Sequence, residues 1–228
     1  MSERENILAR IREALTVAAP VPGHEHRPTG GAPALPSVSD QRRVLPRGGQ
    51  SFDEQLALFR ANAAELRAEF RLIEDHDSLA GELKGLGAAE GWRRAASHSG
   101  ELAGAACRAL GLPVLLTETP FDKRELAQCD VGISECDALV AQTGSVVVTS
   151  RSAGGRALSV LPPHHVVLAR REQLVPDLPA AFALLKSKYR AAYPSMISII
   201  TGPSRTGDIE RILVLGAHGP KKLTILCL

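Results

Sequence analysis

Short apolar runs of strand length alternate with helical segments over the second half of the chain. The runs are rich in Val, Ile and Leu and lie between Gly-rich turns and a helical pattern at Glu172–Tyr189. Near-continuous apolar strands separated by helices are typical of a parallel sheet that is covered on both faces. The pattern therefore predicts an α/β fold with an open, mostly parallel sheet flanked by helices. The strand-like runs are 112–118, 137–144, 145–150, 164–169, 196–201, 212–217 and 222–228.

A helical pattern precedes these runs. Ser51 and Glu54 form a capping box, and apolar residues spaced four and three apart follow from Phe52 to Ile73. The spacing predicts one long amphipathic helix. Its apolar seam is expected to dock on its own domain, and a coiled-coil or dimer face is the alternative.

The N-terminal region differs in composition from the rest. Ser2 and Glu5 make a first capping box for a short amphipathic helix, and six prolines between Pro20 and Pro46 then interrupt every periodicity. We therefore divide the chain into residues 1–50, an N-terminal helix with a Pro/Gly-rich arm, and residues 51–228, the folded domain.

The charge balance limits the partners. The chain has 27 Lys and Arg against 25 Asp and Glu, a net charge of +2, which gives no whole-molecule field for nucleic acid or an anionic membrane. The longest uncharged stretch, 191–204, is 14 residues long and too short to span a bilayer. The N-terminus has no secretory signal pattern. We expect a cytoplasmic protein with no membrane span and no nucleic-acid partner.

The cysteines and histidines give no metal-site pattern. Cys107, Cys129, Cys136 and Cys227 include no Cys-x-x-Cys pair, so buried, reduced thiols are the expectation. The adjacent histidines of 164–165 would point to opposite faces of a strand, which argues against a shared metal. We expect no metal and no cofactor bound by this chain.

Three polar loops follow strand-like runs, and ligands of open α/β sheets bind at the carboxyl ends of strands. A small anion is the expected ligand, because glycines expose backbone N–H groups and Arg binds carboxylate or phosphate. Each loop also has a purely structural interpretation: a turn with a solvated Arg, a helix cap at Asp208, or a structural His218. The candidate ligand-binding residues are Gln142, Thr143, Gly144, Arg156, Gly202, Ser204, Arg205, Thr206, Asp208, His218 and Gly219.

Three segments together resemble a known family. AQTGSVVV, RALSVLPPHHVVLARREQLVPDL and ISIITGPSRTGDIERILVLGAHGPKKLTILCL, in that order, are similar to the lactate utilisation protein C family, whose defining unit is the LUD (lactate utilisation) domain. The resemblance covers roughly residues 52–228. It implies a fold like that of the sugar-phosphate isomerase and coenzyme A transferase superfamily. It also implies a role in oxidising L-lactate to pyruvate beside two partner proteins that carry iron–sulfur clusters.

The resemblance leaves the activity of this chain open. The polar signature of the family falls on Gly202–Ser204, Thr206, Asp208, Glu210 and His218–Pro220, but Gln142 stands where relatives tend to have an acidic residue. An amide is a poor nucleophile, so Gln142 weakens a covalent mechanism there unless the fold brings Glu135 to the site.

We expect an accessory or regulatory subunit that binds a small anion. The alternative is a stand-alone enzyme for a phosphorylated or coenzyme A-linked substrate, with His218 or Asp208 as acid–base groups. A purely structural polar edge is the third interpretation.

Overall fold

The computed structural model describes residues 5, 7–10, 12, 47–190, 192–206, 214–215 and 219–228. The chain divides into two compact units, Met1–Val44 and Leu45–Leu228. The candidate residues Asp208 and His218 lie outside the described residues.

Six parallel strands form the main sheet, in the order β1-β12-β7-β4-β2-β3. This confirms the predicted α/β class with a mostly parallel sheet. The strands are β1 (Glu69–Leu72), β2 (Ala95–Ser97), β3 (Val114–Leu116), β4 (Val131–Glu135), β7 (His164–Ala169) and β12 (Lys222–Cys227).

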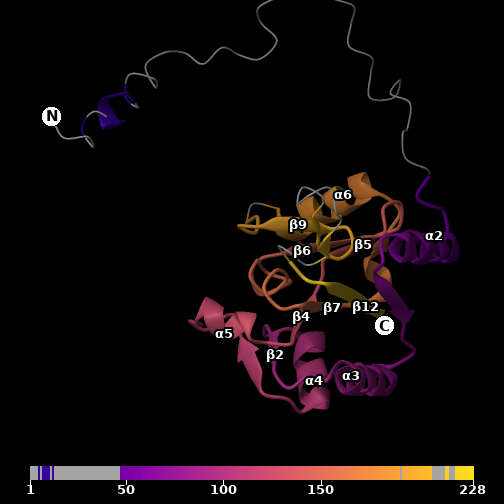
Figure 1. Ribbon diagram of the computed structural model, residues 1–228. Coiled ribbons are helices and arrows are strands. Elements are labelled where there is room, and N and C mark those ends of the chain that lie inside the picture. Colours follow the sequence, from indigo (N-terminus) through magenta and orange to yellow (C-terminus); the bar gives the residue numbers. More distant parts are fainter. Residues whose placement is uncertain are drawn as a thin grey trace, which may run out of the picture. The chain divides into compact units, whose positions relative to one another are not determined.

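A smaller sheet of four strands, in the order β8-β5-β6-β9, lies against one face of the main sheet (Figure 1). It is mixed: β5 pairs parallel with β8, whereas the pairs β5–β6 and β6–β9 are antiparallel. Its strands are β5 (Ala138–Val140), β6 (Ser145–Thr149), β8 (Leu174–Val175) and β9 (Ile197–Ile200). A two-stranded ribbon joins β10 (Arg205–Thr206) and β11 (Val214–Leu215).

The helices complete the layers (Figure 1). Helices α3 (His76–Glu90) and α4 (Glu101–Leu110) pack on one face of the main sheet through Leu79, Leu83 and Leu102. Helix α6 (Leu178–Tyr189) covers the outer face of the small sheet. Helix α2 (Phe52–Glu65) contributes Phe59 and Ala63 to the core between the two sheets. A short helix, α5 (Lys123–Ala127), and a 3₁₀ turn, η1 (Arg171–Gln173), complete the elements.

Helix α2 is shorter than the sequence predicts. The capping bond from Glu54 N to Ser51 Oγ (3.2 Å) forms as expected. The helix nevertheless ends at Glu65, and Phe70 belongs to strand β1, so the prediction of one helix to Ile73 is wrong. The cause lies at Arg67, whose φ of +61° takes the chain out of the helix.

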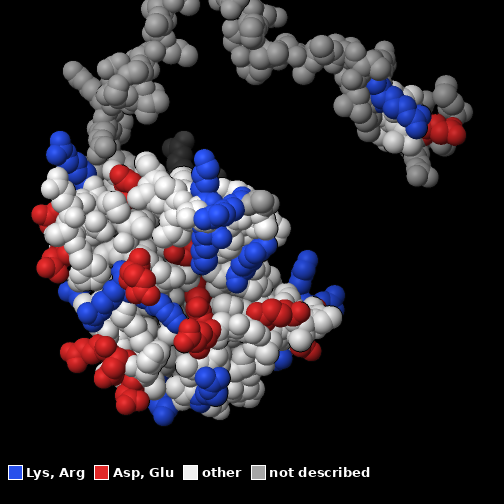
Figure 2. Space-filling model, turned by 180° about the vertical axis from the view of Figure 1, so that it is seen from behind, with Lys and Arg blue, Asp and Glu red and all other residues white. Residues whose placement is uncertain are grey.

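Charged side chains of both signs cover the surface in small groups. Figure 2 shows basic and acidic side chains gathered in separate, neighbouring clusters on one face of the domain. Any attraction for an anion is therefore local, as a net charge of +2 suggests. No helix within the described part of the chain combines the length and the apolar character that crossing a membrane requires.

Candidate ligand-binding cleft

A cleft of about 410 Å³ opens at the carboxyl ends of β2, β4 and β7. Open α/β sheets bind ligands at this edge, because loops diverge there and leave a crevice. The start of the loop after β6 and the end of α6 form the opposite wall. The charged or polar residues that line the whole cleft include His98, Glu135, Arg151, Arg170, Lys188 and Tyr189.

His98, directly after β2, holds the end of β4 in place. Its Nε2 accepts a hydrogen bond from the backbone N–H of Glu135 at 3.1 Å, so the ring proton belongs on Nδ1, which lies 3.9 Å from Oε1 of Glu118. Burial lowers the pKa of His98, although Glu135 and Glu118 act to raise it. His98 is therefore a neutral positioning residue whose lone pair is already used.

Glu135 is the last residue of β4, and its side chain lies over the first turn of α4. Its Oε1 accepts a hydrogen bond from Ala103 N at 3.1 Å. The positive end of the helix dipole favours a charged carboxylate at this position. Gly100 leaves the space for it, since a Cβ there would lie 2.1 Å from the same oxygen. The fold thus holds this carboxylate in place in the lining of the cleft.

A buried network stands behind the opposite wall. Oδ1 of Asp137 accepts hydrogen bonds from Lys188 Nζ at 2.6 Å and Tyr189 OH at 2.7 Å. The Tyr189 oxygen is also 3.1 Å from Thr149 Oγ1. Burial acts to raise the pKa of Asp137, but hydrogen bonds from Lys188, Ser152 and Tyr189 outweigh it and hold that pKa below its ordinary value. The network fixes the last turn of α6 against β5 and β6.

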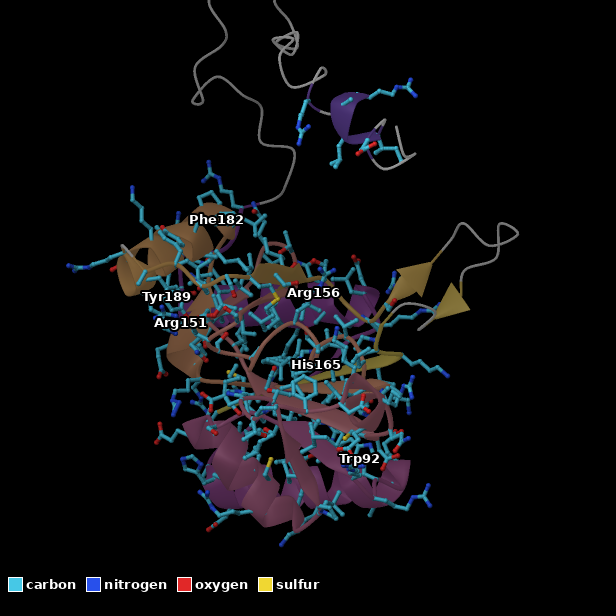
Figure 3. All side chains as sticks on the ribbon, turned by 90° about the vertical axis from the view of Figure 1, so that its left-hand side faces the viewer. Trp92, Arg151, Arg156, His165, Phe182 and Tyr189 are labelled. Carbon is cyan, nitrogen blue, oxygen red and sulfur yellow. The ribbon has the colours of Figure 1, made fainter. Side chains whose placement is uncertain are left out.

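Two arginines at the cleft differ in their partners. Arg170 is held by Glu101, with Nη2 at 2.7 Å from Oε2. Arg151 lies over the ring of Tyr189, with 5.6 Å from Cζ to the ring centroid, and no described carboxylate is within ion-pair distance of it. Figure 3 shows Arg151 beside Tyr189 on one side of the domain. Arg151 is consequently the guanidinium that a bound anion can engage.

The thiol of Cys136 is a poor nucleophile. The residue is 2% exposed, and burial raises the pKa of its thiol well above the ordinary value. Gln173 holds its backbone through a 2.7 Å hydrogen bond from Nε2 to the carbonyl oxygen. Of the four unpaired cysteines, Cys129, Cys136 and Cys227 are buried and Cys107 is half-buried.

The structure places the loop Gln142–Gly144 away from this cleft, against α2. Asn62 donates from Nδ2 to the carbonyl oxygens of Ala141 (2.8 Å) and Gln142 (3.0 Å). Gly144 has a φ of +63°, and a Cβ there would lie 2.8 Å from backbone atoms of Asn62 and Ala63. Oγ1 of Thr143 is buried without a hydrogen-bond partner among the described residues.

Candidate residues of the last loop lie near the same helix. Ser145 Oγ contacts Thr201 Oγ1 at 2.9 Å, which joins the two loops. Gly202 has a φ of +88° and packs against the carbonyl oxygen of Leu66. Beyond it, Ser204 N donates to Pro220 O at 2.9 Å.

The other candidates occupy different surroundings. A Cβ at Gly219 would lie 3.0 Å from the side chain of Ser204. Arg205 is exposed and begins the ribbon β10–β11, with Thr206 next to it. Arg156 is exposed and does not line the cleft, and Figure 3 shows it apart from Arg151.

The loop that follows β6 and carries the candidate Arg156 reaches the cleft through its first residues. Ser152 lines the cleft, and Gly154, with φ +59°, packs on His98 and Thr117. The sequence pattern indicates Glu135 only as a conditional substitute for Gln142, and it does not indicate His98, Arg151 or Tyr189. A usable signal existed for Glu135, because a charged residue at the end of a buried strand marks the ligand edge of a parallel sheet.

The fold and cleft together define an α/β protein with a polar crevice at the carboxyl edge of a parallel sheet. The LUD domain model matches residues 113–228, half of the chain, and the chain belongs to this family. The whole small sheet and four of the six strands of the main sheet lie inside the matched region, whereas β1 and β2 precede it.

Curated relatives of this chain are named lactate utilization protein C. A lactate utilization protein C of Geobacillus sp. (strain WCH70) is 38% identical over 101 residues, which cover 43% of this chain and 42% of the relative. A lactate utilization protein C of Deinococcus radiodurans is 30% identical over 118 residues, which cover 51% of this chain and 55% of the relative. The matched stretch thus spans about half the length of these relatives.

A solved structure supports the fold. The crystal structure of a DUF162 family protein from Deinococcus radiodurans superimposes with a TM-score of 0.62, covering 78% of this chain and 99% of that one, at 22% sequence identity. The likeness concerns the architecture of the domain.

Proposed function

We propose that this chain takes part in lactate utilisation as an accessory or regulatory subunit, and that its cleft binds a small carboxylate. The naming of its relatives as lactate utilization protein C supports a role in lactate utilisation. Redox chemistry in this proposal occurs in partner proteins that carry iron–sulfur clusters, and this chain binds no cofactor of its own. A cytoplasmic location, where lactate oxidation would occur, is part of the same proposal.

The observation that carries the ligand proposal is the state of Arg151. Its guanidinium stacks on Tyr189 and lacks a carboxylate partner among the described residues, whereas Arg170 and Lys188 are each held by one. A guanidinium presents parallel N–H donors that match the two oxygens of a carboxylate. The ring of Tyr189, itself fixed by Asp137 and Thr149, holds this donor at the cleft.

A second function is favoured by Glu135. A carboxylate held over a helix N-terminus, in the same cleft as Arg151, has the position of a nucleophile or general base. This arrangement suits the alternative of a stand-alone enzyme that acts on a phosphorylated or coenzyme A-linked substrate. In that case Arg151 binds the anionic part of the substrate and Glu135 reacts.

The two functions differ in what purified material does. We would purify the tagged full chain from cells grown on lactate, without oxygen, and assay the eluate for lactate-dependent dye reduction. Co-elution of iron–sulfur proteins with activity supports the subunit. A solitary chain that turns over a phosphorylated or coenzyme A-linked compound, and that Glu135→Gln inactivates, contradicts it.

The cleft itself is tested with two arginine variants. Arg151→Gln should abolish the activity of the eluate or weaken carboxylate binding by about tenfold or more, since it removes a charged hydrogen-bond donor. Arg156→Gln is the matched control, because Arg156 is an exposed arginine five residues along the chain that does not line the cleft. Equal effects of the two variants would move the ligand away from this cleft.

A further inference from the structure

A second cavity, of about 230 Å³, lies at the opposite edge of the main sheet, where β1, β12 and β7 begin. Its polar lining comprises Arg67, Glu69, Glu90, His164, Lys221 and Thr224, together with Lys222. Strand β7 runs six residues from this edge to the cleft, so the two sites are about 17 Å apart along the strand. Trp92, which contacts His164, lies across the domain from Arg151 and Tyr189 in Figure 3.

Positive charges at this cavity exceed their described partners. Lys222 is held by Glu90, with Nζ at 2.6 and 2.7 Å from the two carboxylate oxygens. Glu69 has a weaker contact to Arg71 at 3.5 Å. Neither Arg67 nor Lys221 has a carboxylate within ion-pair distance in the part of the chain that the structure describes. With Arg67, Lys221 and Lys222 against Glu69 and Glu90, the cavity lining therefore has a net charge of +1, and Arg67 and Lys221 are its cations without a described ion-pair partner.

His164 supplies a buried polar atom with no protein partner. The residue is 4% exposed, and its Nε2 lies 2.9 Å from Thr224 Oγ1. Its Nδ1 is buried, and no described residue forms a hydrogen bond with it. Buried ring nitrogens are normally paired, and His164 lines the cavity, so its Nδ1 is available to a group bound there. Thr224 Oγ1 also lies 3.5 Å from Glu69 Oε2. In the tautomer in which Thr224 donates to Nε2 of His164, the ring carries its proton on Nδ1 and can donate it to an oxyanion.

The backbone at Arg67 points to a use for this side chain. Arg67 follows the last turn of α2 with a φ of +61°, and the bonds Arg67 N to Ala64 O (3.0 Å) and Ala68 N to Ala63 O (2.9 Å) close the helix. This left-handed position is normally occupied by glycine, because a Cβ is strained there. A residue that keeps such strain is a functional candidate when its side chain lines a cavity.

We propose that this cavity binds a phosphate group, either inorganic phosphate or the phosphate of a small phosphomonoester. Phosphate carries a charge between about −1.5 and −2 near pH 7, and Arg67 and Lys221, the two cations without a described ion-pair partner, are positioned to bind it. Its several oxygens accept from donors that approach from different sides, here Arg67, Lys221 and His164. The cavity is smaller than the roughly 300–1,000 Å³ of pockets that hold drug-sized molecules, so a nucleotide does not fit. The site is separate from the cleft and goes beyond the proposed function.

The test is calorimetric titration of the full chain in phosphate-free buffer. Inorganic phosphate, glycerol 3-phosphate and L-lactate are the three probes. We expect saturable binding of one or both phosphate compounds and at least about tenfold weaker binding of the lactate monoanion, since lactate neutralises only one of the two cations. Binding of glycerol 3-phosphate alone would identify a monoester as the source of the phosphate.

Variants tie the binding to this cavity. Arg67→Gly removes the charge at a position that favours glycine, and Lys221→Gln removes the other cation from an exposed side chain. Each should weaken phosphate binding by about tenfold or more. Arg190→Gly is the matched control, because Arg190 is the other non-glycine residue with positive φ (+40°) in the described chain and does not line the cavity.

Three results would overturn the proposal. The first is the lack of saturable binding of either phosphate compound. The second is unchanged binding in both Arg67→Gly and Lys221→Gln, with thermal unfolding confirming that the variants are folded. The third is equal weakening by Arg190→Gly, which would place the effect in the overall charge of the protein.

Discussion

Nζ of Lys188 lies 2.6 Å from Oδ1 of Asp137, and the Asp137 side chain is completely buried while that of Lys188 is about half exposed. The cation therefore remains hydrated on one side and neutralises a carboxylate that has no other charged partner described. Removing the cation would leave a buried negative charge, which is costlier than the pair itself is stabilising.

Lys188→Met should accordingly lower the free energy of unfolding by about 2 kcal/mol, because Asp137 loses its counter-charge and keeps only the Tyr189 hydroxyl and its other neutral contacts. Urea unfolding monitored by circular dichroism measures the change. Lys186→Met, on the same last turn of α6 and exposed, is the control. Equal destabilisation by the two variants would mean that the ion pair contributes nothing.

The buried histidines should make the stability of the fold depend on pH from about 6.5 downward. Burial lowers the pKa of His165 from 6.5 to about 3, and its Nε2 lies 2.9 Å from Ser134 Oγ. Between these two values the unfolded chain binds a proton that the folded protein does not. The free energy of unfolding should therefore fall as pH decreases from 6.5, by up to about 1.4 kcal/mol per pH unit for such a group.

Urea unfolding at pH 7, 6 and 5 measures this slope. His98 and His164, whose pKa values burial also lowers, contribute in the same direction. His165→Gln should reduce the slope, whereas His76→Gln, at an exposed position, should leave it unchanged. A wild-type protein of constant stability from pH 7 to 5 would show that these histidines are protonated in the folded state.

The sequence predicted the strands that carry long apolar runs, such as β7 and β12, because burial on both faces of a sheet leaves a strong signal. It did not predict where α2 ends. Phe70 continues the apolar spacing of the helix by coincidence. The turn occurs at Arg67, where neither glycine nor proline marks the end of a helix. Only contacts with β12 decide that this segment is a strand.

The cleft was predictable in its place but not in its members. The rule for parallel sheets indicates the carboxyl edge, yet Glu135 and Arg151 meet there only because β4 and β6 belong to two sheets packed face to face. The polar turns at Gly144 and Gly202, which the sequence predicts to bind a ligand, pack closely against α2 and its C-cap residue Leu66. Whether they also bind a ligand remains a prediction.

Substitutions at Gly144 and Gly155 distinguish a steric clash with α2 from backbone strain alone. Gly144→Ala should lower the free energy of unfolding by about 2 kcal/mol or more, because φ is +63° and the new Cβ would meet α2 backbone at 2.8 Å. Gly155→Ala also has a positive φ but meets nothing within 4 Å, so it should cost about 1 kcal/mol, from backbone strain alone. Urea unfolding compares them, and a smaller effect at Gly144 would contradict the close packing on α2.

Arg67 predicts an exchange of stability against binding. Arg67→Gly should raise the free energy of unfolding by about 1 kcal/mol, since glycine adopts a φ of +61° without a Cβ clash. Arg67→Ala removes the same charge but keeps the strain, so it should not be stabilised. Urea midpoints of the two variants and the wild type measure the difference.

If glycine and alanine changed stability equally, charge rather than backbone conformation would control this position. If glycine stabilises and phosphate binding weakens in the same variant, the strain at the end of α2 is retained for the ligand.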